Sequence, residues 1–360
     1  MSRVTIPIGP QHPLLKEPLS FSITLEGENV IDSVLRLGYV HRGIEKLAES
    51  RSYIQNITLF ERVCGICSHI HTTTYCQAVE GLLGLNVPRR GVYIRMLLCE
   101  LERIHSHLLW LGVLAKNIGL NTVFMYAWRD REIVLDLMEE ISGGRVSHAI
   151  NTIGGVRKNL TEDQLQKLIS GLVVLSSRVE DLLRIVENDR SFKARTRGIG
   201  FLSEEDVRRF CVVGPIARAS GGRVDLRKDA PYAFYEELSF NVVTMSEGDV
   251  WARSMVRIQE TSEAIRLCEQ IVEKLPSGEI AVTMKRKVPT GEFISRSEAP
   301  RGEVIYFVKS DGSQSPARVK VRTPTLTALI TLPQQLRGLQ MADVSAVVAG
   351  VDLCIACADR

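Results

Sequence analysis

Apolar residues recur at helical spacing along three long stretches of the chain. In residues 92–116, leucine and isoleucine return every three or four positions. Residues 161–186 show the same spacing and begin with a capping box, in which Thr161 and Gln164 can satisfy each other's backbone donors. A third stretch covers residues 248–275. The pattern predicts three long helices that pack together.

Alternating apolar positions predict two small sheets beside these helices. Residues 20–40 contain two such runs around a turn at 27–29. Near the C-terminus, GEVIYFVKS and ARVKVR flank a turn at residues 311–313, and helical spacing returns over 325–336. We therefore predict an α+β fold that is predominantly α-helical, with a central bundle of long helices and small peripheral β-sheets.

The chain shows no internal repeat or obvious linker, so we expect a single domain over residues 1–360. Its expected parts are an N-terminal β-hairpin segment (1–45), a helical core (46–275), a small β region (276–325), and a C-terminal helix with a candidate metal-binding tail (326–360). The 45 Lys and Arg residues nearly balance the 42 Asp and Glu residues, which argues against a nucleic-acid partner. No secretory signal and no run of about eighteen apolar residues occurs.

Eight cysteines without a secretory signal indicate a reducing compartment, where thiols serve as metal ligands or core residues. Four of them form two C-x-x-C pairs, Cys64 with Cys67 and Cys354 with Cys357. One pair alone would fit core cysteines or a redox dithiol equally well, whereas two pairs favour a four-thiolate site for zinc, iron or nickel. Compact zinc sites usually place their pairs roughly 15 to 20 residues apart. Pairs at opposite ends of the chain instead favour a buried catalytic centre.

The motifs around these pairs resemble those of nickel-iron hydrogenase large subunits. RVCGICSHIH and DLCIACADR look like the two metal-binding signatures of that family, and GPQHP, HRGIE, RASGGRVDLR and EAPRGE fit it in the same order. Several of these segments are also similar to the quinone-site subunit of respiratory complex I, a relative that has lost the metal-binding cysteines. Within the family, GYVHRGIEKL looks most like the membrane-bound, energy-converting Ech type. The sequence departs from the family at Leu353, where proline is common, and at Arg360, where histidine is frequent.

The resemblance implies a nickel ion bound by Cys64, Cys67, Cys354 and Cys357. Cys67 and Cys357 would also bridge to an iron that carries carbon monoxide and cyanide ligands. The implied chemistry is heterolytic, and Cys354 would accept the first proton. Glu17 would relay that proton, with an ordinary solvated glutamate as the alternative. Iron-sulfur clusters are expected only in partner subunits, because the chain has no further cysteine set.

The resemblance also places other groups around the centre. Arg301 would orient hydrogen or a water with its planar guanidinium, unless it forms an ordinary loop ion pair. His71 would donate a hydrogen bond to a bridging sulfur, and Glu45 would help to bind a magnesium ion or a water network. Contacts to the cyanide ligands or outer-shell roles are expected of Pro324, Thr325 and Asp352.

The implied activity is reversible reduction of protons to hydrogen with electrons from reduced ferredoxin. Expected partners are a hydrogenase small subunit with a 4Fe-4S cluster, a ferredoxin-type iron-sulfur subunit, and integral membrane subunits that translocate ions. The chain would then be a peripheral subunit at the cytoplasmic face of the cell membrane. Two alternatives stay open: a quinone or sulfur reductase subunit without a nickel-iron centre, and a structural zinc-binding subunit.

Overall fold

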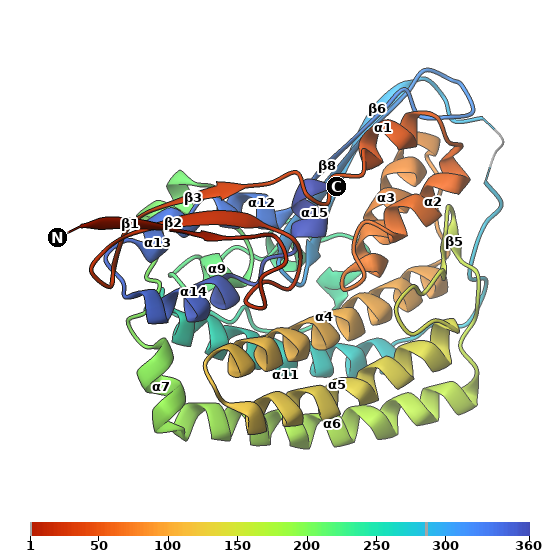
Figure 1. The fold of residues 1–360 in the computed structure, drawn as a ribbon. Helices are drawn as coiled ribbons and strands as arrows, with labels where there is room; N and C mark the ends of the chain where they lie inside the picture. The colour runs from red at the N-terminus through yellow and green to blue at the C-terminus, as the bar shows by residue number, and fades with distance from the viewer. Residues whose placement is uncertain (1, 285–286) are drawn as a thin grey trace.

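Four long helices form the centre of the molecule. The structure is a computed structural model that describes residues 2–284 and 287–360. Helices α4 (Arg89–Asn117), α5 (Asn121–Ser142), α6 (Glu162–Asn188) and α11 (Val250–Glu273) pack against one another in the lower part of Figure 1. Their facing sides bury aliphatic side chains together with Trp110, and removal of this apolar surface from water is the main stabilising term. The predicted fold class is confirmed.

Three of these helices coincide with the three predicted stretches. The capping box at the start of α6 forms as expected, because the Thr161 side chain accepts from the Gln164 amide and the Gln164 side chain accepts from the Thr161 amide. The sequence analysis did not predict α5. Charged residues at 129–132 interrupt its apolar spacing, and its buried face is defined by packing against α4 and α6.

A three-stranded antiparallel sheet lies at the N-terminus, on the left of Figure 1. Strands β2 (Ser20–Glu26) and β3 (Asn29–Arg36) form the predicted hairpin. Strand β1 (Arg3–Ile8) was not predicted; it pairs with β2, and most of its side chains stay exposed. The loop between β1 and β2 carries Glu17, so the sheet fixes where that side chain enters the protein.

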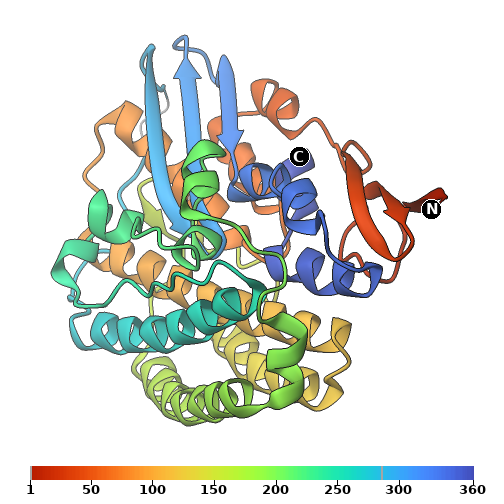
Figure 2. The same cartoon turned by 90° about the vertical axis from the view of Figure 1, so that its left-hand side faces the viewer.

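The second sheet consists of β6 (Gly291–Ala299), β7 (Gly302–Ser310) and β8 (Arg318–Arg322), seen at the top of Figure 2. Strands β7 and β8 match the predicted runs, whereas β6 was not predicted. Arg301 lies in the tight turn between β6 and β7. The single helix expected over 325–336 is wrong: the segment forms α12 (Pro324–Leu329) and α13 (Leu332–Leu336). Pro333 lacks the N–H that a continuous helix would need there.

Shorter elements join the bundle to the sheets. They are α1 (Ile44–Glu49), α2 (Tyr53–Glu61), α3 (Ser68–Leu83), β4 (Asn151–Thr152), β5 (Gly155–Val156), α7 (Arg190–Thr196), α8 (Glu204–Arg209), α9 (Pro215–Arg218), α10 (Leu226–Asp229), α14 (Val344–Val351) and α15 (Ile355–Asp359). The start of α3 and the start of α15 lie against each other. Cys67 contacts Cys357 there, and Cys64 contacts Cys354, each across 290 residues of sequence. Within the described residues, no helix is both long and apolar enough to cross a membrane.

Candidate metal centre

Four buried cysteine sulfurs lie together where α3 and α15 begin. The sulfur of Cys354 is 3.3 Å from that of Cys64 and 3.1 Å from that of Cys357, which is 3.5 Å from that of Cys67. All four sulfurs lie within 4.8 Å of one another. Metal–thiolate bonds of about 2.3 Å place the sulfurs of a tetrahedral ion roughly 3.8 Å apart. The structure therefore brings the four predicted cysteines together at a spacing that suits metal binding.

The local backbone presents these sulfurs at the starts of helices. Cys67 is the N-cap residue of α3, and Cys354 is the N-cap residue of α15. The positive end of a long helix such as α3 favours a thiolate nearby. Between α14 and α15, Asp352 adopts a left-handed backbone with φ of 59°, which turns the chain sharply just before Cys354. The last two cysteines thereby reach the first two.

Glu17 reaches the cysteines from the β1–β2 loop. Its Oε2 atom accepts a hydrogen bond from the Ala356 amide at 2.8 Å, and the Cys354 thiol lies 3.8 Å from its Oε1 atom. Burial raises the pKa of Glu17, and a negative charge on Cys64 raises it further. The side chain also borders a small cavity of about 20 Å³, which Asn117 also lines. A carboxyl group placed in this way can exchange a proton with the thiol.

Arg301 is held by the residue that precedes the last cysteine pair. Its Nε donates to the Asp352 carbonyl at 3.0 Å, and its Nη2 donates to the Asp352 carboxylate at 3.1 Å. Lys16 binds the same carboxylate at 2.9 Å. Although burial opposes ionisation, Arg301 and Lys16 hold the pKa of Asp352 well below its usual range. The guanidinium is therefore fixed and charged, and its buried Nη1 has no hydrogen-bond partner among the described residues.

His71 links the cysteines to the second sheet. Its Nε2 lies 3.4 Å from the Cys357 sulfur, and its Nδ1 lies 2.8 Å from the hydroxyl of Tyr306 on β7. Burial lowers the pKa of His71 to about 4, so the imidazole is neutral at neutral pH. If the Tyr306 hydroxyl donates to Nδ1, then Nε2 carries the proton and donates to sulfur. With that donor assignment, Tyr306 selects the tautomer that can hydrogen bond to Cys357.

A small cavity lies directly beside two of the sulfurs. Its volume is about 10 Å³, room for about one water molecule, and its lining includes Cys67, Cys357 and Arg301. Pro324 and Thr325 close it at the start of α12, and the Thr325 hydroxyl accepts from the Cys354 amide at 3.4 Å. The cavity thus adjoins the two cysteines for which the family resemblance implies bridging roles.

Glu45 lies among cations instead of joining the sulfur cluster. Its carboxylate binds Arg360 at 3.0 Å and Lys320 at 3.2 Å, and it accepts from the Val321 amide at 3.1 Å. Although burial opposes ionisation, the Val321 amide and Arg360 hold the pKa of Glu45 below its ordinary value. A magnesium ion would have to displace these cations, and its binding at Glu45 stays a prediction.

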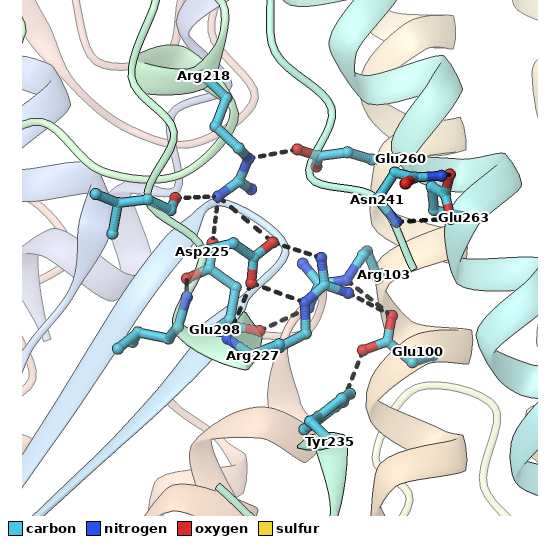
Figure 3. Close-up of polar contacts among 12 residues, drawn as sticks. Glu100, Arg103, Arg218, Asp225, Arg227, Tyr235, Asn241, Glu260, Glu263 and Glu298 are labelled. Atoms are coloured by element: carbon cyan, nitrogen blue, oxygen red, sulfur yellow. Dashed lines mark hydrogen bonds and ion pairs between the residues drawn. The ribbon is translucent and has the colours of Figure 1, made fainter. Parts of the chain in front are cut away.

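A buried network of ion pairs anchors the end of β6, directly before the turn that contains Arg301 (Figure 3). Arg103 of α4 donates to the Glu298 carbonyl at 2.7 Å. Arg218 of α9 donates to the Glu298 carboxylate at 2.9 Å and to Glu260 of α11 at 2.6 Å. The rest of the network includes Glu100, Asp225, Arg227 and Tyr235. Buried charges of both signs are paired here, and the pairs tie the end of β6 to two bundle helices.

Family models match adjoining parts of the chain. A nickel-dependent hydrogenase model matches residues 42–116, and a model of the 49 kDa subunit of respiratory-chain NADH dehydrogenase matches residues 117–287 and 280–360. The carbon monoxide-induced hydrogenase of Rhodospirillum rubrum is 40% identical over the full length of both chains. The chain belongs to the complex I-related family of nickel-iron hydrogenase large subunits.

Two further relatives show the breadth of this hydrogenase family. The membrane-bound hydrogenase subunit alpha of Pyrococcus furiosus is 38% identical, and the alignment covers 99% of this chain and 87% of the relative. A chain from the structure of the membrane-bound sulfane sulfur reductase, an archaeal respiratory membrane complex, matches with a TM-score of 0.95 and 32% identity, over 99% of this chain and 98% of that chain. Both names describe membrane-bound systems. This chain is a hydrogenase-type oxidoreductase subunit.

Sequence reasoning missed the groups that hold the predicted residues in place. Lys16 is adjacent to the predicted Glu17, yet its contact with Asp352 spans 336 residues. Tyr306 is one apolar position of an ordinary strand in the sequence. The sequence signals for the ion-pair network were RASGGRVDLR, which contains Arg218, Asp225 and Arg227, and EAPRGE, which contains Glu298. No local pattern identifies which distant residues these charges contact.

Proposed function

We propose that the chain is the catalytic subunit of an energy-converting nickel-iron hydrogenase that reversibly reduces protons to hydrogen with electrons from reduced ferredoxin. The four cysteines would bind nickel, and Cys67 and Cys357 would also bind an iron that carries carbon monoxide and cyanide. Soft thiolate donors suit both metals. When bound, the centre would supply a site at which hydrogen is formed or split heterolytically.

The cluster of four buried cysteine sulfurs, with the Glu17 carboxyl and the fixed Arg301 guanidinium beside it, is the observation that carries this proposal. The iron and its small ligands would lie next to Cys67 and Cys357, where the structure has a small cavity of about 10 Å³. The cavity lies at those two cysteines, and Arg301, Pro324 and Thr325 line it. The buried, unpartnered Nη1 of Arg301 leaves a donor available to a small polar group in this region.

The protein groups around the sulfurs suit proton transfer. Cys354 would accept or release the proton at its sulfur, and Glu17 would exchange it at Oε1. His71 would hold the Cys357 sulfur by a hydrogen bond and lower its basicity. The Cys354 thiolate would therefore be more basic than the Cys357 thiolate. The proton would bind at Cys354, beside Glu17.

Electrons would reach this chain from partner subunits. Apart from the four clustered cysteines, no group of three or more metal-ligating side chains that includes a thiol is found in the described part of the chain. Iron-sulfur clusters would accordingly belong to a hydrogenase small subunit with a 4Fe-4S cluster and to a ferredoxin-type subunit. Integral membrane subunits would translocate ions, and this chain would lie peripherally at the cytoplasmic face of the membrane. No nucleic acid is involved.

Metal analysis and infrared spectroscopy of the purified complex test the proposal. Nickel should be present at one atom per catalytic subunit, and iron should exceed it because the partner subunits carry iron-sulfur clusters. Infrared bands of metal-bound carbon monoxide and cyanide should also appear. These bands should disappear when Cys67 or Cys357 is replaced by serine, while the exposed control Cys211→Ser should retain them. Stoichiometric zinc without these bands would contradict the proposal and identify a structural site.

Reduction of sulfane sulfur is a second candidate, favoured by the TM-score of 0.95 to a chain of the sulfane sulfur reductase. In that case the same fold would act on a polysulfide rather than on protons. The purified complex separates the two activities directly. Hydrogen evolution with reduced ferredoxin, in the absence of sulfur compounds, supports the hydrogenase, whereas sulfide release without hydrogen supports the second candidate.

A further inference from the structure

Helix α3 begins without a capping side chain of its own. Its N-cap residue is Cys67, whose side chain makes no capping hydrogen bond and instead lies among the other sulfurs. The first N–H groups of a helix need acceptors, which serine, threonine, aspartate or asparagine usually provide. A cysteine that is needed as a ligand cannot fill this role, so α3 needs an acceptor from elsewhere.

Glu102 on α4 supplies that acceptor. Its Oε1 accepts from the His69 amide at 2.6 Å, and its Oε2 accepts from the Ile70 amide at 3.0 Å. The side chain is fully buried, and it forms no salt bridge with any described residue. Burial raises the pKa of Glu102 to about 8, while the two amide hydrogen bonds act against this rise. A carboxyl group without a cation partner therefore caps α3 from a neighbouring helix.

We infer that Glu102 is a positioning residue, which caps the first turn of α3 in place of Cys67 and thereby sets the direction from which Cys67 and His71 face the metal centre. The functional consequence rests on the proposed role of Cys67. The capping itself does not, because it depends only on two hydrogen bonds from backbone amides of α3 to the Glu102 side chain on α4. Leucine at position 102 would leave both amides without an acceptor, and glutamine would leave one.

Hydrogen exchange of the intact, metal-free chain tests the capping. Peptides that cover residues 66–74, analysed by mass spectrometry, should exchange about tenfold faster in Glu102→Gln and about a hundredfold faster in Glu102→Leu, as expected for the loss of one or two buried hydrogen bonds. Glu80→Gln is the matched control. Glu80 is a buried carboxylate near the end of α3, the helix that the peptides report on, but it binds Arg95 and the Gly154 amide. This control should leave exchange over 66–74 unchanged.

Cobalt(II) titration of the same chains tests the positioning of Cys67. The thiolate-to-cobalt absorption should weaken, and the affinity should fall about tenfold in Glu102→Leu, whereas Glu80→Gln should behave as wild type. Any of three results would overturn the inference. Exchange could be unchanged in both Glu102 variants, it could be accelerated equally in Glu80→Gln, or the cobalt spectrum could be unchanged in Glu102→Leu. If Glu102→Leu does not fold, Glu102→Gln decides by the same criteria. Neither assay needs nickel or iron, so a failure here is distinguishable from a failure of the proposed function.

Discussion

Replacement of Glu17 by glutamine should uncouple proton transfer from metal binding. The amide oxygen can still accept from the Ala356 amide, which is now 2.8 Å from the carboxylate, so the cysteine segment should keep its position. Loss of one charge from that hydrogen bond should cost about 1 kcal/mol or less of folding free energy. The proton exchange with the Cys354 thiol, however, has no substitute, because an amide has no titratable proton near neutral pH.

The size of the kinetic effect follows from this geometry. Loss of a positioned acid–base group typically slows a reaction by about 10²- to 10⁴-fold, which corresponds to a barrier increase of about 3 to 5 kcal/mol. We therefore expect exchange between hydrogen gas and deuterated water to fall by at least about a hundredfold in Glu17→Gln. Nickel content and infrared bands should stay at wild-type levels. The exposed Glu28→Gln serves as the matched control and should exchange normally.

The raised pKa of Glu17 adds a test by pH. The fold favours the protonated carboxyl, so the associated stability is complete below the ordinary value of 4.5 and is lost as pH rises through the higher folded-state pKa. Thermal unfolding of the intact chain should accordingly show wild type losing stability relative to Glu17→Gln as the pH is raised from about 4. Normal exchange of hydrogen with water by Glu17→Gln would refute the relay, and a pH-independent stability difference would refute the raised pKa.

Three further variants separate the other roles. Cys354→Ser should abolish hydrogen turnover and lower nickel content, since a hydroxyl is a poor ligand for a soft metal; normal turnover with full nickel would remove Cys354 from the metal set. Arg301→Lys should lower turnover by about ten- to a hundredfold with nickel retained, because a point charge cannot keep both contacts to Asp352, and an unchanged rate would make the side chain purely structural. Tyr306→Phe should shift the infrared bands and slow turnover about tenfold, since His71 would lose the partner that selects its tautomer; identical bands would show that the hydroxyl has no influence.

The sequence was most informative where function constrains residue type locally. The four cysteines were predicted as one site from their spacing and family motifs, and the structure brings them within 4.8 Å. The long helices were predicted wherever their apolar spacing was regular. Helix α5 was missed because one of its charged residues, Asp130, is buried and pairs with Arg178 of α6, which only the packed bundle defines. Strands β1 and β6 were missed because partner strands, rather than their own alternation, order them.

The surroundings of the sulfurs could not be predicted, because they depend on contacts across the whole chain. Asp352 was expected as an outer-shell acid, but its three cationic partners come from distant parts of the chain: Arg301 and Lys16 from separate loops and Arg257 from α11. Glu45 matched a family acid, yet the cations of β8 and Arg360 occupy its carboxylate. Motifs specify which residue types meet at a site, whereas the fold decides which of them are already paired.

The distinction between a zinc site and a redox centre depends on these surroundings rather than on the sulfurs. Four thiolates at this spacing would hold a tetrahedral zinc equally well. A structural zinc, however, gains nothing from a carboxyl with a raised pKa beside one thiol, and a buried, unpaired guanidinium N–H costs stability without a ligand to bind. Both side chains lower the stability of the fold: Glu17 because its carboxyl is buried, and Arg301 because its Nη1 is buried without an acceptor. A reactive centre would use Glu17 as a proton carrier and Arg301 as a hydrogen-bond donor. Buried polar groups that weaken the fold persist where they act on a substrate, which favours a reactive centre over a structural ion.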